Sequence, residues 1–133
     1  MSSTSTQAAW LQARLAASVT PWQVVFFHHA PYSSGSTHGS TTGMRWSFAA
    51  WGADAVFAGH EHNYERLLVD GIPYFVEGAG GGALYAFGTP LPESQFRNST
   101  DYGAMLVTAT QISILFEFYN QAGTRVDSYT VVK

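Results

Sequence analysis

The sequence predicts an α/β (α+β) fold in which a strand–helix–strand unit precedes an antiparallel β meander. Short apolar runs at residues 22–27 and 53–58 lack alternation, which is typical of strands covered on both faces. Further along, Asp70-Gly71 between two strand-like runs indicates a hairpin. No repeat or linker interrupts the chain, so we expect residues 1–133 to form a single unit.

The first half is predicted to contain two helices and two strands. The first helix covers residues 6–17, with Thr6 as its N-cap and apolar side chains at helical spacing. A loop rich in Ser, Thr and Gly follows the first strand, at residues 28–43. The second helix is predicted at residues 44–51, and the second strand, at 53–58, ends before a glycine.

The second half is predicted to be antiparallel. Strands at residues 66–69 and 72–76 flank the Asp70-Gly71 turn, and Pro73 favours an edge or irregular position for the second of them. A glycine-rich segment then opens a long loop over residues 77–101. The remaining strands are expected at residues 102–108, 112–119 and 125–132.

Composition excludes several classes of protein. Aromatic residues make up 15% of the chain and charged residues 11%, a balance opposite to that of disordered chains. The six Lys and Arg residues form no patch and the net charge is −3, so we expect no nucleic-acid partner. No apolar run approaches the ~20 residues of a membrane span, so no membrane partner is expected. Cysteine is absent, which excludes thiolate ligands and leaves the compartment open.

The five histidines are concentrated between residues 28 and 62, next to the predicted strand ends. His28 and His29 follow the first buried strand, and His60 and His62 follow the second. In open α/β sheets, ligands bind at the carboxyl ends of the strands. Imidazole is also the commonest protein ligand for zinc and similar metals. The pattern therefore predicts a metal site at this edge of the sheet.

His60 and His62 are separated by one residue and follow Gly59. On a loop that turns off a strand, two such histidines can reach two adjacent metal ions, whereas on a regular strand both would face one side. The alternative is that they are loop histidines bonded to backbone carbonyls. The first interpretation is favoured because His28 stands at a second, parallel strand end.

These residues resemble known motifs. Val25-Phe26-Phe27-His28 and Gly59-His60-Glu61-His62 are similar to the V-x-x-H and G-H-x-H motifs of the calcineurin-like metallophosphoesterases. The wider segments 26–40, 44–67 and 73–81 resemble the C-terminal part of bacterial purple-acid-phosphatase-like enzymes. The resemblance implies a partial αββα sandwich and hydrolysis of a phosphate ester at a metal centre.

The resemblance also implies a role for each histidine. His28 and His60 would bind one ion of a two-metal centre, and His62 would bind the other. His38 would contact phosphate or protonate the leaving group, and His29 would assist with the substrate. The implied ions are zinc, iron or manganese, and the implied ligand is a phosphate ester or free phosphate. The tail Tyr64-Glu65-Arg66 is expected to be structural, with Glu65 and Arg66 supporting the loop.

The family's other ligand motifs, D-x-[GH], G-D-x-x-[DY] and G-N-H-[DE], would have to precede His28, and none is present there because residues 1–27 contain no Asp, Glu or Asn. We therefore expect a truncated form with weak or no activity alone, holding one ion rather than two. Three interpretations stay open. The chain is part of a phosphoesterase completed by other residues, or a single-metal module using His28, His60 and His62 with water or Glu61, or a structural relic.

The same comparison predicts an interface. The two strands at residues 22–27 and 53–58 would have bare edges where N-terminal strands of the family pair. We therefore expect either a homo-oligomer or association with a complementary N-terminal half.

Overall fold

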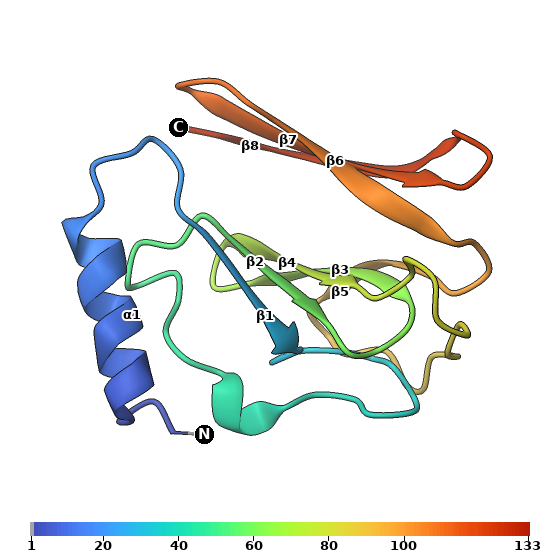
Figure 1. Cartoon of the computed structure of the whole chain (residues 1–133), viewed down its shortest axis with the longest axis horizontal. Helices are drawn as coiled ribbons and strands as arrows, with labels where there is room; N and C mark the ends of the chain where they lie inside the picture. Colours follow the sequence, from blue (N-terminus) through green and yellow to red (C-terminus); the bar gives the residue numbers. More distant parts are fainter. Residues whose placement is uncertain (1) are drawn as a thin grey trace.

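The computed structural model describes residues 2–133, in which one α-helix accompanies two β-sheets (Figure 1). No helix in this part of the chain has the length and apolar character needed to cross a membrane. In chain order the elements are α1 (Thr6–Ala17), β1 (Val24–His29), the 3₁₀ helix η1 (Thr42–Met44), β2 (Ala55–Gly59), β3 (Tyr64–Val69), β4 (Ile72–Glu77), β5 (Ser94–Asn98), β6 (Gly103–Ala109), β7 (Ser113–Asn120) and β8 (Arg125–Val132).

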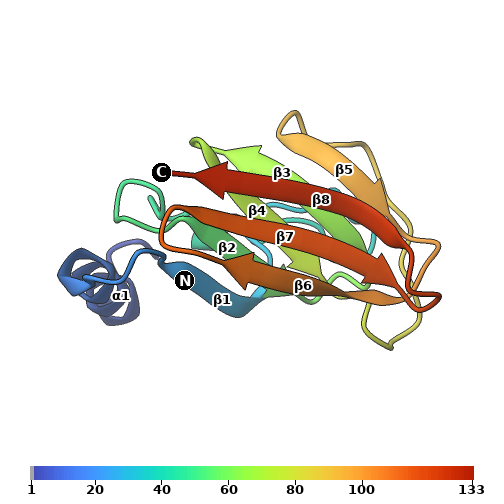
Figure 2. The same ribbon diagram turned by 90° about the horizontal axis from the view of Figure 1, so that it is seen from above.

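The first sheet has five strands in the order β1-β2-β4-β3-β5. Strands β1, β2 and β4 run parallel, and β3 pairs antiparallel with both β4 and β5. The three parallel strands therefore end at the same edge of the sheet. The second sheet, β6-β7-β8, is an antiparallel meander that lies over the first (Figure 2). The fold is thus mixed α/β, as predicted, with one mixed and one antiparallel sheet.

Two hydrophobic cores cover the opposite faces of the five-stranded sheet. On one face, α1 and the segment after β1 pack against residues such as Val56, Tyr74 and Val76. On the other face, Phe75 from β4 contacts the inner side chains of the three-stranded sheet, including Phe116. The alternation of Tyr74, Phe75 and Val76 between the two cores explains the continuous apolar sequence of β4.

Helix α1 occupies the predicted range, but its N-cap is Ser5 and not Thr6. The Ser5 hydroxyl accepts a hydrogen bond from the Ala8 amide at 3.2 Å, so the capping prediction was wrong by one residue. Ala8 is completely buried against the sheet.

The helix predicted at residues 44–51 does not form. Instead a short 3₁₀ turn at Thr42–Met44 leads into an irregular segment. Met44, Trp46 and Phe48 are all buried, whereas the residues between them are exposed. This period of two is incompatible with a helix, in which these three side chains would point in different directions.

The hairpin around Asp70-Gly71 is confirmed, since both residues have positive φ, 50° and 84°, as a type I′ turn requires. The edge position predicted from Pro73 is wrong, because β4 lies between β2 and β3. Pairing of β4 with β2 begins only at Tyr74, so Pro73 is opposite no β2 residue. The long predicted loop contains one unexpected strand, β5.

The two strands predicted to have bare edges differ from one another. Strand β2 is interior, so that prediction was wrong for it. Strand β1 is at the sheet edge and is not covered on both faces as predicted: Val25 is buried, but Phe26 is 81% exposed. The later strands β6, β7 and β8 lie close to their predicted ranges.

Candidate functional site

Parallel pairing of β1 with β2 brings the first histidines together. Phe27 lies opposite Ala58, whereas the next pair in register is His29 with Gly59, so the ladder is irregular at His28. As a result, His28 Nε2 lies 3.0 Å from His60 Nδ1, although the two residues are far apart in the sequence. The prediction that the two strand ends converge is confirmed.

His60 adopts a left-handed backbone conformation, with φ of 69°. A non-glycine residue pays a steric penalty in this region, and such penalties are concentrated at functional sites. The backbone therefore turns sharply off β2, as expected for the residue after Gly59. This turn directs the His60 ring toward the end of β1.

Two further histidines surround the His60 ring. His38, from the loop after β1, stacks on it with ring centroids 4.0 Å apart, and His29 lies 4.4 Å from it. Desolvation, followed by the charges of His38, His29 and His28, lowers the pKa of His60. Four imidazoles thus converge. We name these four residues the histidine cluster: His28, His29, His38 and His60.

His62 is next to the histidine cluster but makes different contacts. Its ring stacks on Tyr85 at 4.2 Å, and Tyr85 in turn lies 5.7 Å from the His38 ring. His62 Nδ1 lies 3.0 Å from the carbonyl oxygen of Ala83. Tyr85 was missed at the level of sequence, since it lies in a segment whose only signal was its glycine content.

Buried carboxylates hold the loop that carries His38. Glu65 accepts hydrogen bonds from the amide of Ser34, at 2.7 Å, and from its hydroxyl, at 2.5 Å. Its predicted structural role is therefore confirmed, but the loop that it supports is the one after β1. Arg66, expected to have the same role, instead pairs with Asp127 of the second sheet, its Nε lying 2.8 Å from Asp127 Oδ2.

Glu61 does not complete a metal shell. Its side chain is fully buried, and Oε1 accepts hydrogen bonds from the backbone amides of His38 and Gly39. The interpretation of Glu61 as a ligand was therefore wrong, because the carboxylate is directed into the protein.

The donors present fit a metal ion in part. His28 and His60 present ring nitrogens 3.0 Å apart, close enough to share one ion. The hydrogen bond of His62 Nδ1 to a backbone carbonyl leaves Nε2 free, the arrangement common among metal-binding histidines. Within residues 2–133, however, no group of three or more His, Cys, Asp or Glu side chains is close enough to hold an ion. The predicted site residues are thus neighbours, but they do not form a complete metal site.

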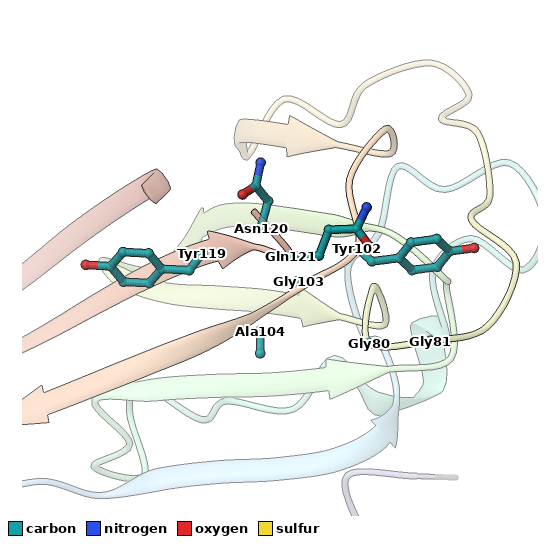
Figure 3. Close-up of a pocket in the computed structure, with 8 residues that line it drawn as sticks. All are labelled: Gly80, Gly81, Tyr102, Gly103, Ala104, Tyr119, Asn120 and Gln121. Atoms are coloured by element: carbon teal, nitrogen blue, oxygen red, sulfur yellow. The ribbon is translucent and has the colours of Figure 1, made fainter. Parts of the chain in front are cut away.

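Two cavities differ in whether they border the histidine cluster. One, of about 570 Å³, is formed by the Gly80-Gly81 loop and the ends of β6 and β7. Figure 3 shows Tyr102 and Tyr119 pointing away from one another at its two sides, and no histidine lines it. A groove of about 320 Å³ between α1 and β1 does border His28 and His29.

Comparisons with known proteins show similarity to phosphoesterases. Residues 2–64 match the calcineurin-like phosphoesterase family. The chain is 30% identical over 98 residues to a nucleotide pyrophosphatase/phosphodiesterase of Hordeum vulgare, covering 59% of this chain and 27% of that protein. It is 36% identical over 80 residues to tartrate-resistant acid phosphatase type 5 of Rattus norvegicus, covering 56% and 24%. It is 31% identical over 100 residues to the probable inactive purple acid phosphatase 1 of Arabidopsis thaliana, covering 60% and 16%.

Solved structures share the fold. A purple acid phosphatase from yellow lupin seeds superposes with a TM-score of 0.85 at 22% identity, over 98% of this chain and 29% of that one. GAP50 of Plasmodium gives a TM-score of 0.76 at 19% identity, over 96% and 43%. Over residues 2–64 the chain is therefore similar to the calcineurin-like phosphoesterases. It resembles purple acid phosphatases, and it spans less than a third of the length of the curated relatives it matches.

Proposed function

We propose that this chain serves in metal-dependent hydrolysis of phosphate esters, at the histidine cluster and the adjacent His62. The observation that carries the proposal is the 3.0 Å approach of His28 Nε2 to His60 Nδ1 at the joint end of two parallel strands. The similarity of residues 2–64 to the calcineurin-like phosphoesterases supports it, because the nearby histidines are those of the V-x-x-H and G-H-x-H motifs.

The ion in this proposal is zinc, iron or manganese, and one ion is favoured over two. His28 and His60 would hold it, and the free Nε2 of His62 would face a second ion if one were bound. An ion of this kind, when bound, polarises the phosphoryl oxygen and acidifies a water molecule.

The remaining histidines act on the substrate in this proposal. His38 lies against His60 and would contact the phosphate or pass a proton to the leaving group. His29, 4.4 Å from His60, would orient the ester or the free phosphate product.

Activity of the chain alone is expected to be weak or absent. The histidines supply only part of an ion's ligands, and no aspartate motif of the family precedes His28 in the sequence. A complementary N-terminal half would provide the rest, in line with the share of each relative that the chain covers.

A second candidate function is a single-metal-binding module that uses His28, His60 and His62 with little or no catalysis. The partial donor set favours it. The Arabidopsis relative, described as a probable inactive phosphatase, also supports it.

The test combines metal analysis with an assay on protein purified without a histidine tag. We expect about one equivalent of zinc after incubation and dialysis, and clearly less in His60→Ala. Less than a tenth of an equivalent in the wild type would contradict both functions. With a chromogenic phosphate ester, hydrolysis that His60→Ala abolishes would support catalysis, whereas equal rates in both would exclude it.

We also propose that the free edge of β1 is covered by a second copy of the chain. In the described residues, β1 pairs on one side only, with β2. Val24 and Phe26 on this strand are exposed, and Phe26 is 81% so. An unpaired strand edge with exposed aromatic surface favours pairing with another strand.

A further inference from the structure

Glu61 lies between two proposed metal ligands, yet its carboxylate is directed away from them. The side chain is completely buried, and Oε1 accepts hydrogen bonds from the consecutive backbone amides of His38 and Gly39, at 2.6 Å for Gly39. Oε2 has no hydrogen-bond partner among residues 2–133. Burial of a carboxylate is unfavourable unless its oxygens are satisfied, so this position requires an explanation.

The surrounding backbone leaves room for this carboxylate. A Cβ atom on Gly35 would lie 2.3 Å from Glu61 Cδ, and one on Gly78 would lie 1.9 Å from the Glu61 carbonyl oxygen. Any other residue at these two positions would displace Glu61. The loop after β1 is thus shaped around the Glu61 carboxylate, and Gly78 after β4 leaves room for the Glu61 backbone.

The two hydrogen bonds that the backbone amides donate to Glu61 restrain the backbone that carries the His38 ring. That ring stacks on His60 at 4.0 Å and 27°, and it has no hydrogen bond of its own to a side chain in the described residues. Hydrogen bonds to a carboxylate are about twice as strong as neutral ones, so they restrain the loop effectively. The hydrogen bonds to Glu61 therefore hold the backbone from which the His38 imidazole projects.

We infer that Glu61 is a positioning residue, which holds His38 over His60 through the loop backbone. Its part in hydrolysis rests on the proposed function, since His38 is the proposed proton donor. The placement of the His38 ring does not rest on the proposed function, because it can be measured without metal or substrate.

Glu65 offers a matched comparison. It is equally buried and binds the same loop, through Ser34, but it makes no hydrogen bond to His38 or Gly39. A general requirement for buried carboxylates in the loop would make the two residues equivalent. A positioning role of Glu61 would instead make the two residues differ in their effect on His38.

The experiment is NMR of the metal-free protein, with the variants Glu61→Ala, Glu61→Gln and Glu65→Gln. In the wild type we expect a nuclear Overhauser effect between the rings of His38 and His60, and slow hydrogen exchange at the amides of His38 and Gly39. In Glu61→Ala the ring contact should be lost and both amides should exchange at least about tenfold faster, while those of β2 and β4 stay protected.

The conservative variant supplies the second measurement. Glu61→Gln keeps an oxygen acceptor without the charge, so exchange at His38 and Gly39 should be intermediate and the ring contact retained. Glu65→Gln should leave both amides within about twofold of the wild type. If Glu61→Ala fails to fold, Glu61→Gln decides: faster exchange supports the inference, and wild-type exchange overturns it. A retained ring contact in folded Glu61→Ala also overturns it.

An assay separates this inference from the proposed function. If the wild type hydrolyses the chromogenic ester, Glu61→Gln should lower kcat while zinc stoichiometry is unchanged. If the wild type is inactive but the NMR results hold, the proposed catalysis fails and the positioning of His38 stands.

Discussion

His28 Nε2 lies 3.0 Å from His60 Nδ1, and this contact joins the ends of two parallel strands. A bond between two imidazoles requires one ring to donate and the other to accept, so it does not survive protonation of both. A metal ion can occupy the same place and bind both nitrogens. His60, whose backbone is strained at a φ of 69°, is therefore also one of the two proposed ligands at this contact.

This strain predicts a difference between two variants of His60. His60→Gly should be more stable than His60→Ala by about 1 kcal/mol, because glycine adopts positive φ without a steric penalty. Both should bind zinc at least about tenfold more weakly than the wild type, since a ligand is lost. Urea unfolding and zinc titration measure the two effects.

Asp70 provides the control, as the other non-glycine residue with positive φ among those described. Asp70→Gly should exceed Asp70→Ala in stability by a similar amount, with zinc affinity unchanged. Weaker zinc binding in the Asp70 variants would show that the His60 effect is not local.

The glycines that follow β4 predict a second difference in stability, between Gly82→Ala and Gly81→Ala. A Cβ on Gly82 would lie 2.6 Å from His62 Nδ1, so Gly82→Ala must move the ring and disturb its stack on Tyr85. We expect a loss of about 1–3 kcal/mol, and loss of the nuclear Overhauser effect between these rings. Gly81 has open space, so Gly81→Ala should change stability by less than about 0.5 kcal/mol. Equal losses in the two variants would refute the close packing of His62.

Asp127 predicts a large effect on stability. Its carboxylate accepts hydrogen bonds from the Tyr64 hydroxyl at 2.7 Å and the Arg66 Nε at 2.8 Å, and so joins the two sheets. The Arg66 and Asp127 side chains are 14% and 7% exposed, so Asp127→Ala leaves a charge without its partner in a largely buried place. We expect a loss of about 3–5 kcal/mol in urea unfolding.

A more exposed ion pair gives the matched control. In the pair of Arg125 with Glu117, Arg125 is 55% exposed, so Glu117→Ala leaves a charge that water can solvate and should cost less than about 1 kcal/mol. If both variants lose the same free energy, burial is not what makes the Asp127 pair important.

Local signals predicted the elements that depend on local chemistry. Asp70-Gly71 predicted its hairpin because only a few residue types accept positive φ at both positions. The helix predicted near Trp46 failed because burial in a common core overrides helical preference. The order of the strands, which places Pro73 inside the sheet, depends on contacts between distant segments.

The features of the candidate site likewise divide into those that the sequence predicted and those that depend on contacts between distant segments. The convergence of His28 and His60 followed from two strands that end at one edge of the sheet. The direction of the Glu61 side chain could not be predicted, because the amides that bind it come from a loop more than twenty residues earlier. Tyr85 was missed for a similar reason, since its stack on His62 requires the glycine-rich segment to fold back.

Glu77 predicts how stability depends on pH. Burial, and then the charge of Asp127, raises the pKa of Glu77 to about 8. The folded state therefore binds the proton more tightly than the unfolded state, so this residue destabilises the fold progressively as pH rises from about 4.5 to 8. At pH 8 the free energy of unfolding of Glu77→Gln should exceed that of the wild type by roughly a few kcal/mol. At pH 4.5 the two proteins should differ little. Urea unfolding of the metal-free proteins across this range measures it, and a constant difference would contradict the raised pKa.

The exposed edge of β1 predicts self-association that depends on Phe26. A second copy on this edge would cover a ring that is 81% exposed, and removing that ring should weaken the contact. We expect the wild type to sediment as a dimer or larger at high micromolar concentration, and Phe26→Ser to shift toward the monomer by about tenfold or more in dissociation constant. Val19→Ser is the control, because Val19 is 97% exposed in the loop before β1 and lies outside the strand. A wild type that sediments as a monomer would mean that this edge is not paired with a second copy, and a complementary N-terminal half would then be the partner to test.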